Sequence, residues 1–96
     1  MQVSIITINY NSSIFTIKLV ESIFENVSKL IDYEIIITDN ASKDSDYKNL
    51  VKALPRDGKI KLYRNKVNNG FSGGIWMAMK NQTVNIYYLS IMTVNV

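Results

Sequence analysis

The stretch that decides the fold is Tyr33-Glu34-Ile35-Ile36-Ile37-Thr38, followed at once by Asp39-Asn40-Ala41-Ser42-Lys43-Asp44. The first six residues are mostly β-branched or aromatic and predict a buried strand, and the next six predict a turn. Asp39 therefore stands at the carboxyl end of a strand, where open α/β sheets bind their ligands. Two interpretations are open: Asp39 contacts a ligand, or its carboxylate caps the next helix by accepting backbone N–H bonds.

The segments on either side repeat the order strand, turn, helix. Residues 3–8 predict a first strand, and apolar residues from Ile14 to Ile31 recur every three or four positions, as on one face of a helix. A helix over residues 47–54 precedes a strand over residues 59–64, whose alternation suits a sheet edge. Residues 75–80 and 86–92 predict a further helix and a fourth strand.

This alternation predicts an α/β fold of about four mostly parallel strands, joined by right-handed crossovers, with helices on both faces. A chain of 96 residues favours one domain, residues 1–96. Because the chain has no Cys and no His, it excludes thiolate nucleophiles, disulfides, Ser-His-Asp triads and the usual zinc sites.

The charge and the apolar runs bear on partners and location. A net charge of +3 falls short of the clustered basic patch of a nucleic-acid binder, so no nucleic acid is expected as a partner. No apolar run reaches the roughly 20 residues of a membrane span, and the first residues lack the features of a secretion signal. We expect a cytoplasmic protein, associated with a membrane only through a partner or through segments outside this chain.

Three polar turns should meet at one edge of the predicted sheet, because parallel strands share the edge where they end. They are residues 9–11, residues 39–44, and residues 68–74, which hold three of the four glycines. An aromatic ring, a carboxylate and a glycine loop together suit a nucleotide, since they can contact the base, the base edge or ribose, and the phosphates. The chain contains neither the dinucleotide-fold nor the P-loop glycine fingerprint.

Three motifs make this hypothesis more specific. They are Val3-Ser4-Ile5-Ile6-Thr7-Ile8-Asn9-Tyr10-Asn11, then Glu34-Ile35-Ile36-Ile37-Thr38-Asp39-Asn40-Ala41-Ser42-Lys43-Asp44, then Asn68-Asn69-Gly70-Phe71-Ser72-Gly73-Gly74. In this order and at this spacing, over about three quarters of the chain, the sequence resembles the N-terminal, nucleotide-sugar-binding part of the family 2 glycosyltransferases.

The resemblance implies a GT-A (Rossmann-like) half-domain in an enzyme that moves a sugar from a nucleotide-diphosphate sugar to an acceptor hydroxyl. The acceptor would be a glycan or a lipid-linked sugar, as in polysaccharide biosynthesis. In the family, the residues matching Ile8 and Tyr10 lie on or beside the base, the residue matching Asp39 hydrogen-bonds the base edge, and the glycine loop lies along the donor. The resemblance thus assigns nucleotide binding to Ile8, Asn9, Tyr10, Asp39, Asn69 and Gly70.

Plainer interpretations of several residues stay open. Tyr10 can simply cover the helix that follows it, and Trp76 stands in an apolar helical run that suits a core position. Lys43 and Arg64 are interpreted as solvated surface charges, and Asp44 as a residue that stabilises its own turn.

The family also has an acidic pair for Mg²⁺ or Mn²⁺ just after its fourth strand, and a catalytic carboxylate in a second half. No Asp or Glu lies between Lys80 and Val96, so we expect no metal or other cofactor in this chain. We expect a truncated member that binds nucleotide without turnover; the alternative is a non-catalytic nucleotide-binding or protein-interaction module. One codon choice for residues 90–93 reads Asn-Asn-Asp in another frame, which motivates the hypothesis of a frameshift near Leu89.

Overall fold

The computed structural model describes residues 3–67 and 88–94, with side chains described for residues 3–67. The elements in chain order are β1 (Val3–Tyr10), α1 (Ser13–Asn26), β2 (Tyr33–Asn40), α2 (Asp44–Ala53), β3 (Ile60–Asn65) and β4 (Tyr88–Val94). These elements confirm the predicted alternation. The predicted helix at residues 75–80 and the loop at residues 68–74 lie outside the described residues.

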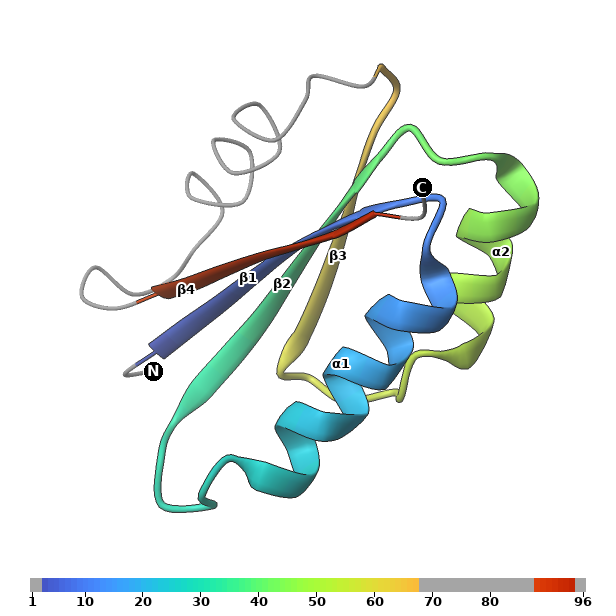
Figure 1. The fold of residues 1–96 in the computed structure, drawn as a ribbon. Helices are drawn as coiled ribbons and strands as arrows, with labels where there is room; N and C mark the ends of the chain where they lie inside the picture. Colours follow the sequence, from blue (N-terminus) through green and yellow to red (C-terminus); the bar gives the residue numbers. More distant parts are fainter. Residues whose placement is uncertain (1–2, 68–87, 95–96) are drawn as a thin grey trace.

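The four strands form one parallel sheet in the order β3-β2-β1-β4 (Figure 1). In the register of the sheet, Asn9 lies opposite Asp39, and Arg64 lies opposite Asp39 on its other side. From β1 to β3 the chain steps across the sheet in one direction, and β4 then pairs with the other side of β1. The boundary between β1 and β4 is therefore a topological switch point, the position where open α/β sheets bind ligands.

The ends of β1, β2 and β3 make up one edge of the sheet, which we call the carboxyl rim: residues 9–11, 39–44 and 64–66. Both described helices lie on the same face of the sheet (Figure 1), because two right-handed crossovers in the same direction must put their helices on one face. The prediction of helices on both faces is thus confirmed for one face within the described residues.

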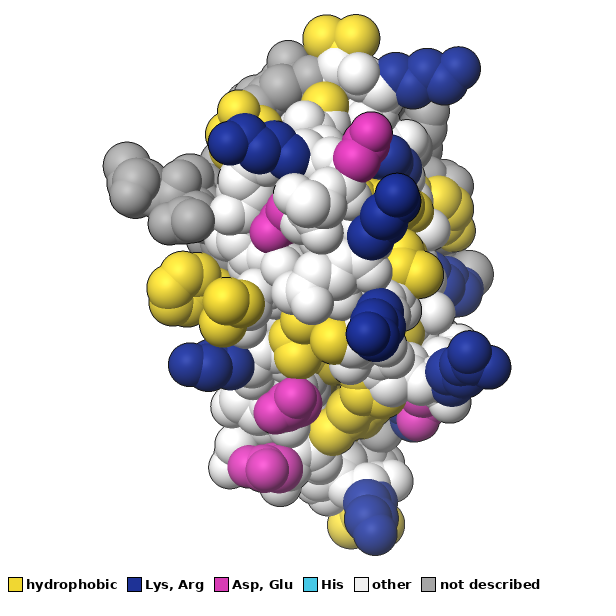
Figure 2. Space-filling model, turned by 90° about the vertical axis from the view of Figure 1, so that its right-hand side faces the viewer, with side chains coloured by type: hydrophobic (Ala, Val, Ile, Leu, Met, Phe, Trp, Pro, Cys, Tyr) yellow, Lys and Arg dark blue, Asp and Glu magenta, His cyan; other side chains and the backbone are white. Residues whose placement is uncertain are grey.

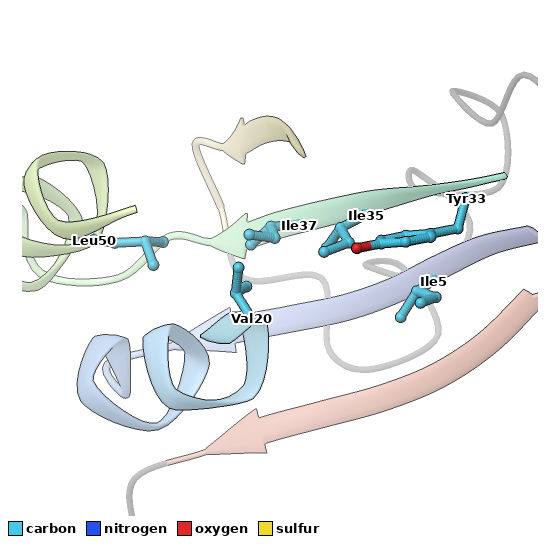
Figure 3. Close-up of a cluster of buried hydrophobic side chains, with 6 residues drawn as sticks. All are labelled: Ile5, Val20, Tyr33, Ile35, Ile37 and Leu50. Atoms are coloured by element: carbon cyan, nitrogen blue, oxygen red, sulfur yellow. The ribbon is translucent and has the colours of Figure 1, made fainter. Parts of the chain in front are cut away.

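The main core lies between this face and the helices. It consists of Ile5, Val20, Tyr33, Ile35, Ile37 and Leu50 (Figure 3). Each fully buried Ile or Leu stabilises the fold by roughly 1.5–3 kcal/mol, so this cluster dominates the packing of the described residues. On the opposite face, Ile6 and Ile36 pack with Tyr63.

The helical stripe predicted from Ile14 to Ile31 is too long. Helix α1 ends at Asn26, Leu30 is 94% exposed in the connection that follows, and Ile14 and Ile31 are exposed as well. Within α1 the period is right, because Val20 is buried and Ile17, Ile23 and Phe24 pack against the core. The spacing misleads after Asn26 because apolar side chains in a connecting turn can match a helical period by chance, whereas Ile14 belongs to the first turn of α1 but points to solvent.

Candidate functional site

A buried pair of polar side chains links the first two strands at the carboxyl rim. Asn9 and Asp39 are both fully buried, and Asn9 Nδ2 donates to Asp39 Oδ1 over 2.9 Å. The same Nδ2 donates to Asp46 Oδ2 over 3.0 Å, and Asn9 Oδ1 accepts from Thr16 Oγ1 over 2.6 Å. Asn9 therefore holds β1 to β2 and to both helices at the point where the rim begins.

The turn after β2 is organised by the Asp39 carboxylate. Ser42 Oγ donates to Asp39 Oδ1 over 2.6 Å, and the Ser42 backbone N–H donates to Asp39 Oδ2 over 3.2 Å. Ala41 between them has a φ of +60°, a left-handed conformation that costs a non-glycine residue about 1–2 kcal/mol. These bonds confirm that Asp39 accepts backbone and side-chain hydrogen bonds from its own turn. A contact between Asp39 and a ligand stays a prediction.

The two turns of the rim are also bonded to each other. The Asn11 backbone N–H donates to Ser42 Oγ over 2.9 Å, and the Lys43 backbone N–H donates to Asn11 Oδ1 over 2.8 Å. Asn11 has a φ of +50°, which Asn tolerates better than most residues. The rim is thus a cross-linked unit rather than a set of independent loops.

Arg64 lies at the surface, as interpreted, but its charge is paired with protein groups rather than only solvated. Its Nε lies 3.5 Å from Asp39 Oδ2, and its Nη2 donates to the Ser42 carbonyl oxygen over 3.0 Å and to Asp44 Oδ1 over 3.1 Å. Its guanidinium carbon lies 4.2 Å from the centre of the Tyr47 ring. The side chain is 34% exposed. Arg64 is paired because the register of β2 and β3 places it directly opposite Asp39. Asp44 also binds this guanidinium, and in this way it contributes to the stability of its own turn.

Asp46 belongs to the same network, although the sequence did not single it out. It accepts the Ser13 backbone N–H over 3.0 Å at the start of α1, in addition to the bond from Asn9. Partial burial acts to raise the pKa of Asp46, but the hydrogen bonds from Ser13, Asn9 and the Ser12 backbone outweigh it and hold that pKa below its usual value. Asp46 therefore stays ionised and ties α2 to the start of α1.

The other predicted site residues lie as follows. Tyr10 is the partly exposed last residue of β1 and lies opposite Val94 of β4, at the switch point. Since successive residues of a strand point to opposite faces, Tyr10 and the buried Ile8 leave the sheet on the face away from the helices, whereas Asn9 and Asp39 face them. Asn69 and Gly70 lie outside the described residues.

Two surface hollows adjoin the rim. One, of about 420 Å³, is lined by Ala41, Ser42, Arg64, Asn65 and Lys66, and we call it the rim hollow. The other, of about 390 Å³, lies between the first turns of the two helices and includes Asn11, Phe15, Lys43 and Asn49 in its lining. Arg64 thus forms a contact with buried Asp39 on one side and a wall of the rim hollow on the other.

The described carboxylates do not fit a divalent cation. No group of three or more acidic side chains among residues 3–67 could hold one. Asp39 and Asp46 accept hydrogen bonds from protein donors, and Asp44 pairs with Arg64.

On the helical side of the molecule, the described Lys and Arg side chains are spread out among acidic and apolar ones (Figure 2). Neither described helix has the length and apolar character needed to cross a bilayer.

The comparison with protein families identifies the class of this chain. The sequence model described as "Glycosyl transferase family 2" matches residues 4–92. The chain therefore belongs to glycosyltransferase family 2, as the three motifs predicted. No curated protein sequence matches it.

A solved structure supports the fold. Mannosyltransferase PcManGT from Pyrobaculum calidifontis, in complex with GDP-Man and Mn²⁺, superposes with a TM-score of 0.63 and 18% identity. The match covers 85% of this chain and 24% of that one, so the chain spans about a quarter of the length of that enzyme. The α/β sheet of Figure 1 thus matches part of a GT-A fold, as the predicted GT-A half-domain implies.

Proposed function

We propose that this chain binds the nucleotide of a nucleotide-diphosphate sugar at the carboxyl rim, as the donor-binding segment of a glycosyltransferase. Such an enzyme moves the sugar to an acceptor hydroxyl on a glycan or a lipid-linked sugar. Family membership and the GT-A fold support the class of reaction. The observation that carries the proposal is the buried Asn9–Asp39 pair at the ends of adjacent parallel strands, beside the switch point and the rim hollow.

In this proposal the two residues at the strand ends have different tasks. Tyr10 provides an aromatic face for the base, and Asp39 accepts an N–H from the base edge, while Asn9 fixes the orientation of the Asp39 carboxylate. Neighbouring strands lie about 4.8 Å apart, so one base can span the ends of β1 and β2. Because Tyr10 and Asp39 leave the sheet on opposite faces, the base must lie above the strand ends rather than on either face.

The remaining predicted contacts keep their place in the proposal. Ile8 is buried on the same face of the sheet as Tyr10, and we propose that it supports the Tyr10 ring. The loop containing Asn69 and Gly70 follows β3 by a few residues, and we propose that it lies along the donor, as its resemblance to the family implies.

We also propose that these 96 residues bind the donor without transferring its sugar. PcManGT is described with Mn²⁺, but the described carboxylates here do not fit a metal, and no acidic residue lies between Lys80 and Val96. The residues described here bind and orient the nucleotide. The acidic pair and the catalytic carboxylate expected of the family would come from elsewhere in a longer protein.

Isothermal titration calorimetry with UDP, dTDP, GDP, ADP and CDP tests the binding proposal. We expect at least one nucleotide to bind, and Tyr10→Ala to weaken its binding roughly tenfold, since base stacking on an aromatic side chain contributes about 1–3 kcal/mol. Phe15→Ala is the matched control, because Phe15 is another aromatic side chain, 54% exposed, that lines the other hollow. It should leave the affinity unchanged.

Three results would contradict the proposal. Binding of none of the five nucleotides would exclude the nucleotide site itself. Equal affinities of wild type and Tyr10→Ala would remove the base contact, and a loss of affinity in Phe15→Ala instead would move the site to the other hollow. Release of free nucleotide from UDP-, GDP- or dTDP-sugars in the presence of MnCl₂ would refute binding without turnover.

A further inference from the structure

The Asp39 carboxylate is already surrounded by protein contacts. Its Oδ1 accepts from Asn9 Nδ2 and from Ser42 Oγ, and its Oδ2 accepts from the Ser42 backbone N–H and faces Arg64 Nε. A carboxylate offers about four acceptor positions, so these four contacts among the described residues occupy it. A ligand can hydrogen-bond Asp39 only by replacing one of them.

Three of these contacts are poor candidates for replacement. Asn9 and Ser42 are buried, and both also bond other parts of the rim: Asn9 holds Thr16 and Asp46, and Ser42 Oγ accepts the Asn11 backbone N–H. Releasing either residue would break the bonds between the two turns. It would also leave buried polar atoms without partners, which is costly in a protein interior.

The contact between Asp39 and Arg64 differs from the other three in its length, in the exposure of the partner and in the interactions that the partner keeps. At 3.5 Å it is the longest of the four, and Arg64 is partly exposed and lines the rim hollow. Arg64 also keeps three other interactions if it leaves Asp39: the Ser42 carbonyl oxygen, Asp44 Oδ1 and the Tyr47 ring. A rotation of the guanidinium away from Asp39 would therefore uncover Oδ2 beside the rim hollow that Arg64 lines, without releasing the Arg64 side chain.

We infer that Arg64 is the group that a bound base displaces from Asp39, and that this competition sets the affinity of the site. The inference rests on the proposed function, because it takes the ligand to be a nucleotide whose base edge offers an N–H donor. In the free protein, Arg64 Nε stands where that donor will lie. On binding, Asp39 Oδ2 exchanges Arg64 for the base, and Arg64 stays on Asp44 and Tyr47 as a positioning residue.

Arg64→Met tests this competition by calorimetry with the nucleotide that wild type binds best. Met keeps an unbranched stem to pack on Tyr47 but donates no hydrogen bond. Among the described residues, Asp39 Oδ2 then keeps the Ser42 N–H alone, so it gains more from a ligand donor. We expect binding to tighten about 3- to 10-fold, although the folded state becomes less stable.

Lys61→Met is the matched control. Lys61 lies on the same strand, and its Nζ is 2.9 Å from Oε1 of Glu34, a fully buried carboxylate like Asp39. This variant removes a comparable ion pair away from the carboxyl rim, so we expect lower stability and an unchanged nucleotide affinity.

A second readout follows the Arg64 side chain directly. In ¹⁵N–¹H spectra the two arginine Nε–H signals come from Arg56 and Arg64, and the one that remains in Arg56→Lys is assigned to Arg64. In wild type we expect nucleotide to shift the Arg64 signal while the Arg56 signal stays in place. If Arg64→Met does not fold, this signal alone decides. An unshifted Arg64 signal at saturation, or weaker or equal binding by a folded Arg64→Met, overturns the competition but leaves the proposed function standing. Absence of binding to wild type refutes the proposed function itself, and the inference with it.

Discussion

Replacing Asn9 by Asp should make the stability of the protein strongly dependent on pH. The change is nearly isosteric, but it puts a carboxyl oxygen where Nδ2 now lies, 2.9 Å from Asp39 Oδ1 and 3.0 Å from Asp46 Oδ2. The carboxylates of Asp39 and Asp46 already lie there, and a third negative charge at this distance is strongly repelled. The new carboxyl can keep its position only by holding a proton and donating it to one of its neighbours.

The magnitude follows from the cost of that proton. An unperturbed Asp has a pKa of about 3.9, and each pH unit above it adds about 1.36 kcal/mol to the free energy of keeping the carboxyl protonated. At pH 7 the variant therefore loses about 4 kcal/mol, and about 1 kcal/mol more at every pH because one donor is missing. The sign is that of a raised folded-state pKa for an acid: the pH-dependent part of the loss shrinks as pH falls, so that near pH 4 only the roughly 1 kcal/mol of the missing donor remains.

The assay is urea unfolding followed by far-UV circular dichroism between pH 4.5 and 7, with wild type measured at each pH and subtracted. A loss of about 5 kcal/mol is a large part of the 5–15 kcal/mol typical of a whole domain. If Asn9→Asp is unfolded at pH 7, the same reasoning predicts that it refolds on acidification. Asn49→Asp is the control, because the exposed Asn49 makes its described bond to Ser13 Oγ, which can donate to a carboxylate instead.

Two outcomes would refute the reasoning. A difference between Asn9→Asp and wild type that stays constant across this pH range would mean that the new carboxyl is not forced to bind a proton. A loss below 1 kcal/mol at pH 7 would mean that Asn9 does not donate to both carboxylates in solution.

Three further predictions concern residues around the same sheet. Lys61→Met removes the ammonium group that pairs with the fully buried Glu34 carboxylate and should lower the unfolding free energy by about 2–3 kcal/mol, measured by urea unfolding; an unchanged midpoint would contradict the ion pair. Ala41→Gly should raise it by about 1 kcal/mol, because glycine adopts a φ of +60° without strain; a loss of stability would count against that turn geometry. Asp46→Asn should cost most near pH 7 and progressively less below pH 4, because the lowered pKa of Asp46 contributes stability that is lost as pH falls through it; a constant cost would argue against this linkage.

Much of the fold could be predicted from local sequence because its elements have strong local signals. Residues 33–40 are buried at every position, as their continuous apolar run predicts for a central parallel strand. β3 lies at the edge of the described sheet, as its alternation indicates. The end of α1 could not be predicted in the same way. Leu30 and Ile31 continue the helical period, and only the tertiary structure decides that they lie beyond the helix.

The candidate site was predicted in part, and the missing part depends on register. Asp39 and Asn9 were recognised from their place at strand ends, and the structure brings them into contact. The pairing of Arg64 with Asp39 was missed because nothing in a single sequence aligns β3 with β2, and a shift of one residue would turn Arg64 to the other face. The available signal was the position of Arg64 at the end of its own strand, which is where Asp39 stands in β2.

Exposure separates the residues of the rim that hold it together from those that a ligand can reach. Asn9, Asp39 and Ser42 are buried and bonded to one another, so their place in a family motif is explained by the geometry of two turns before any ligand is considered. Tyr10 and Arg64 lie beside them and have side chains that solvent reaches. Assigning a ligand contact to every residue of a motif therefore overestimates the number of residues that touch the ligand. Here the base would meet a preformed carboxylate whose replaceable partner is Arg64. Selectivity at this edge would therefore depend on which base offers an N–H donor that can replace Arg64 Nε at Asp39.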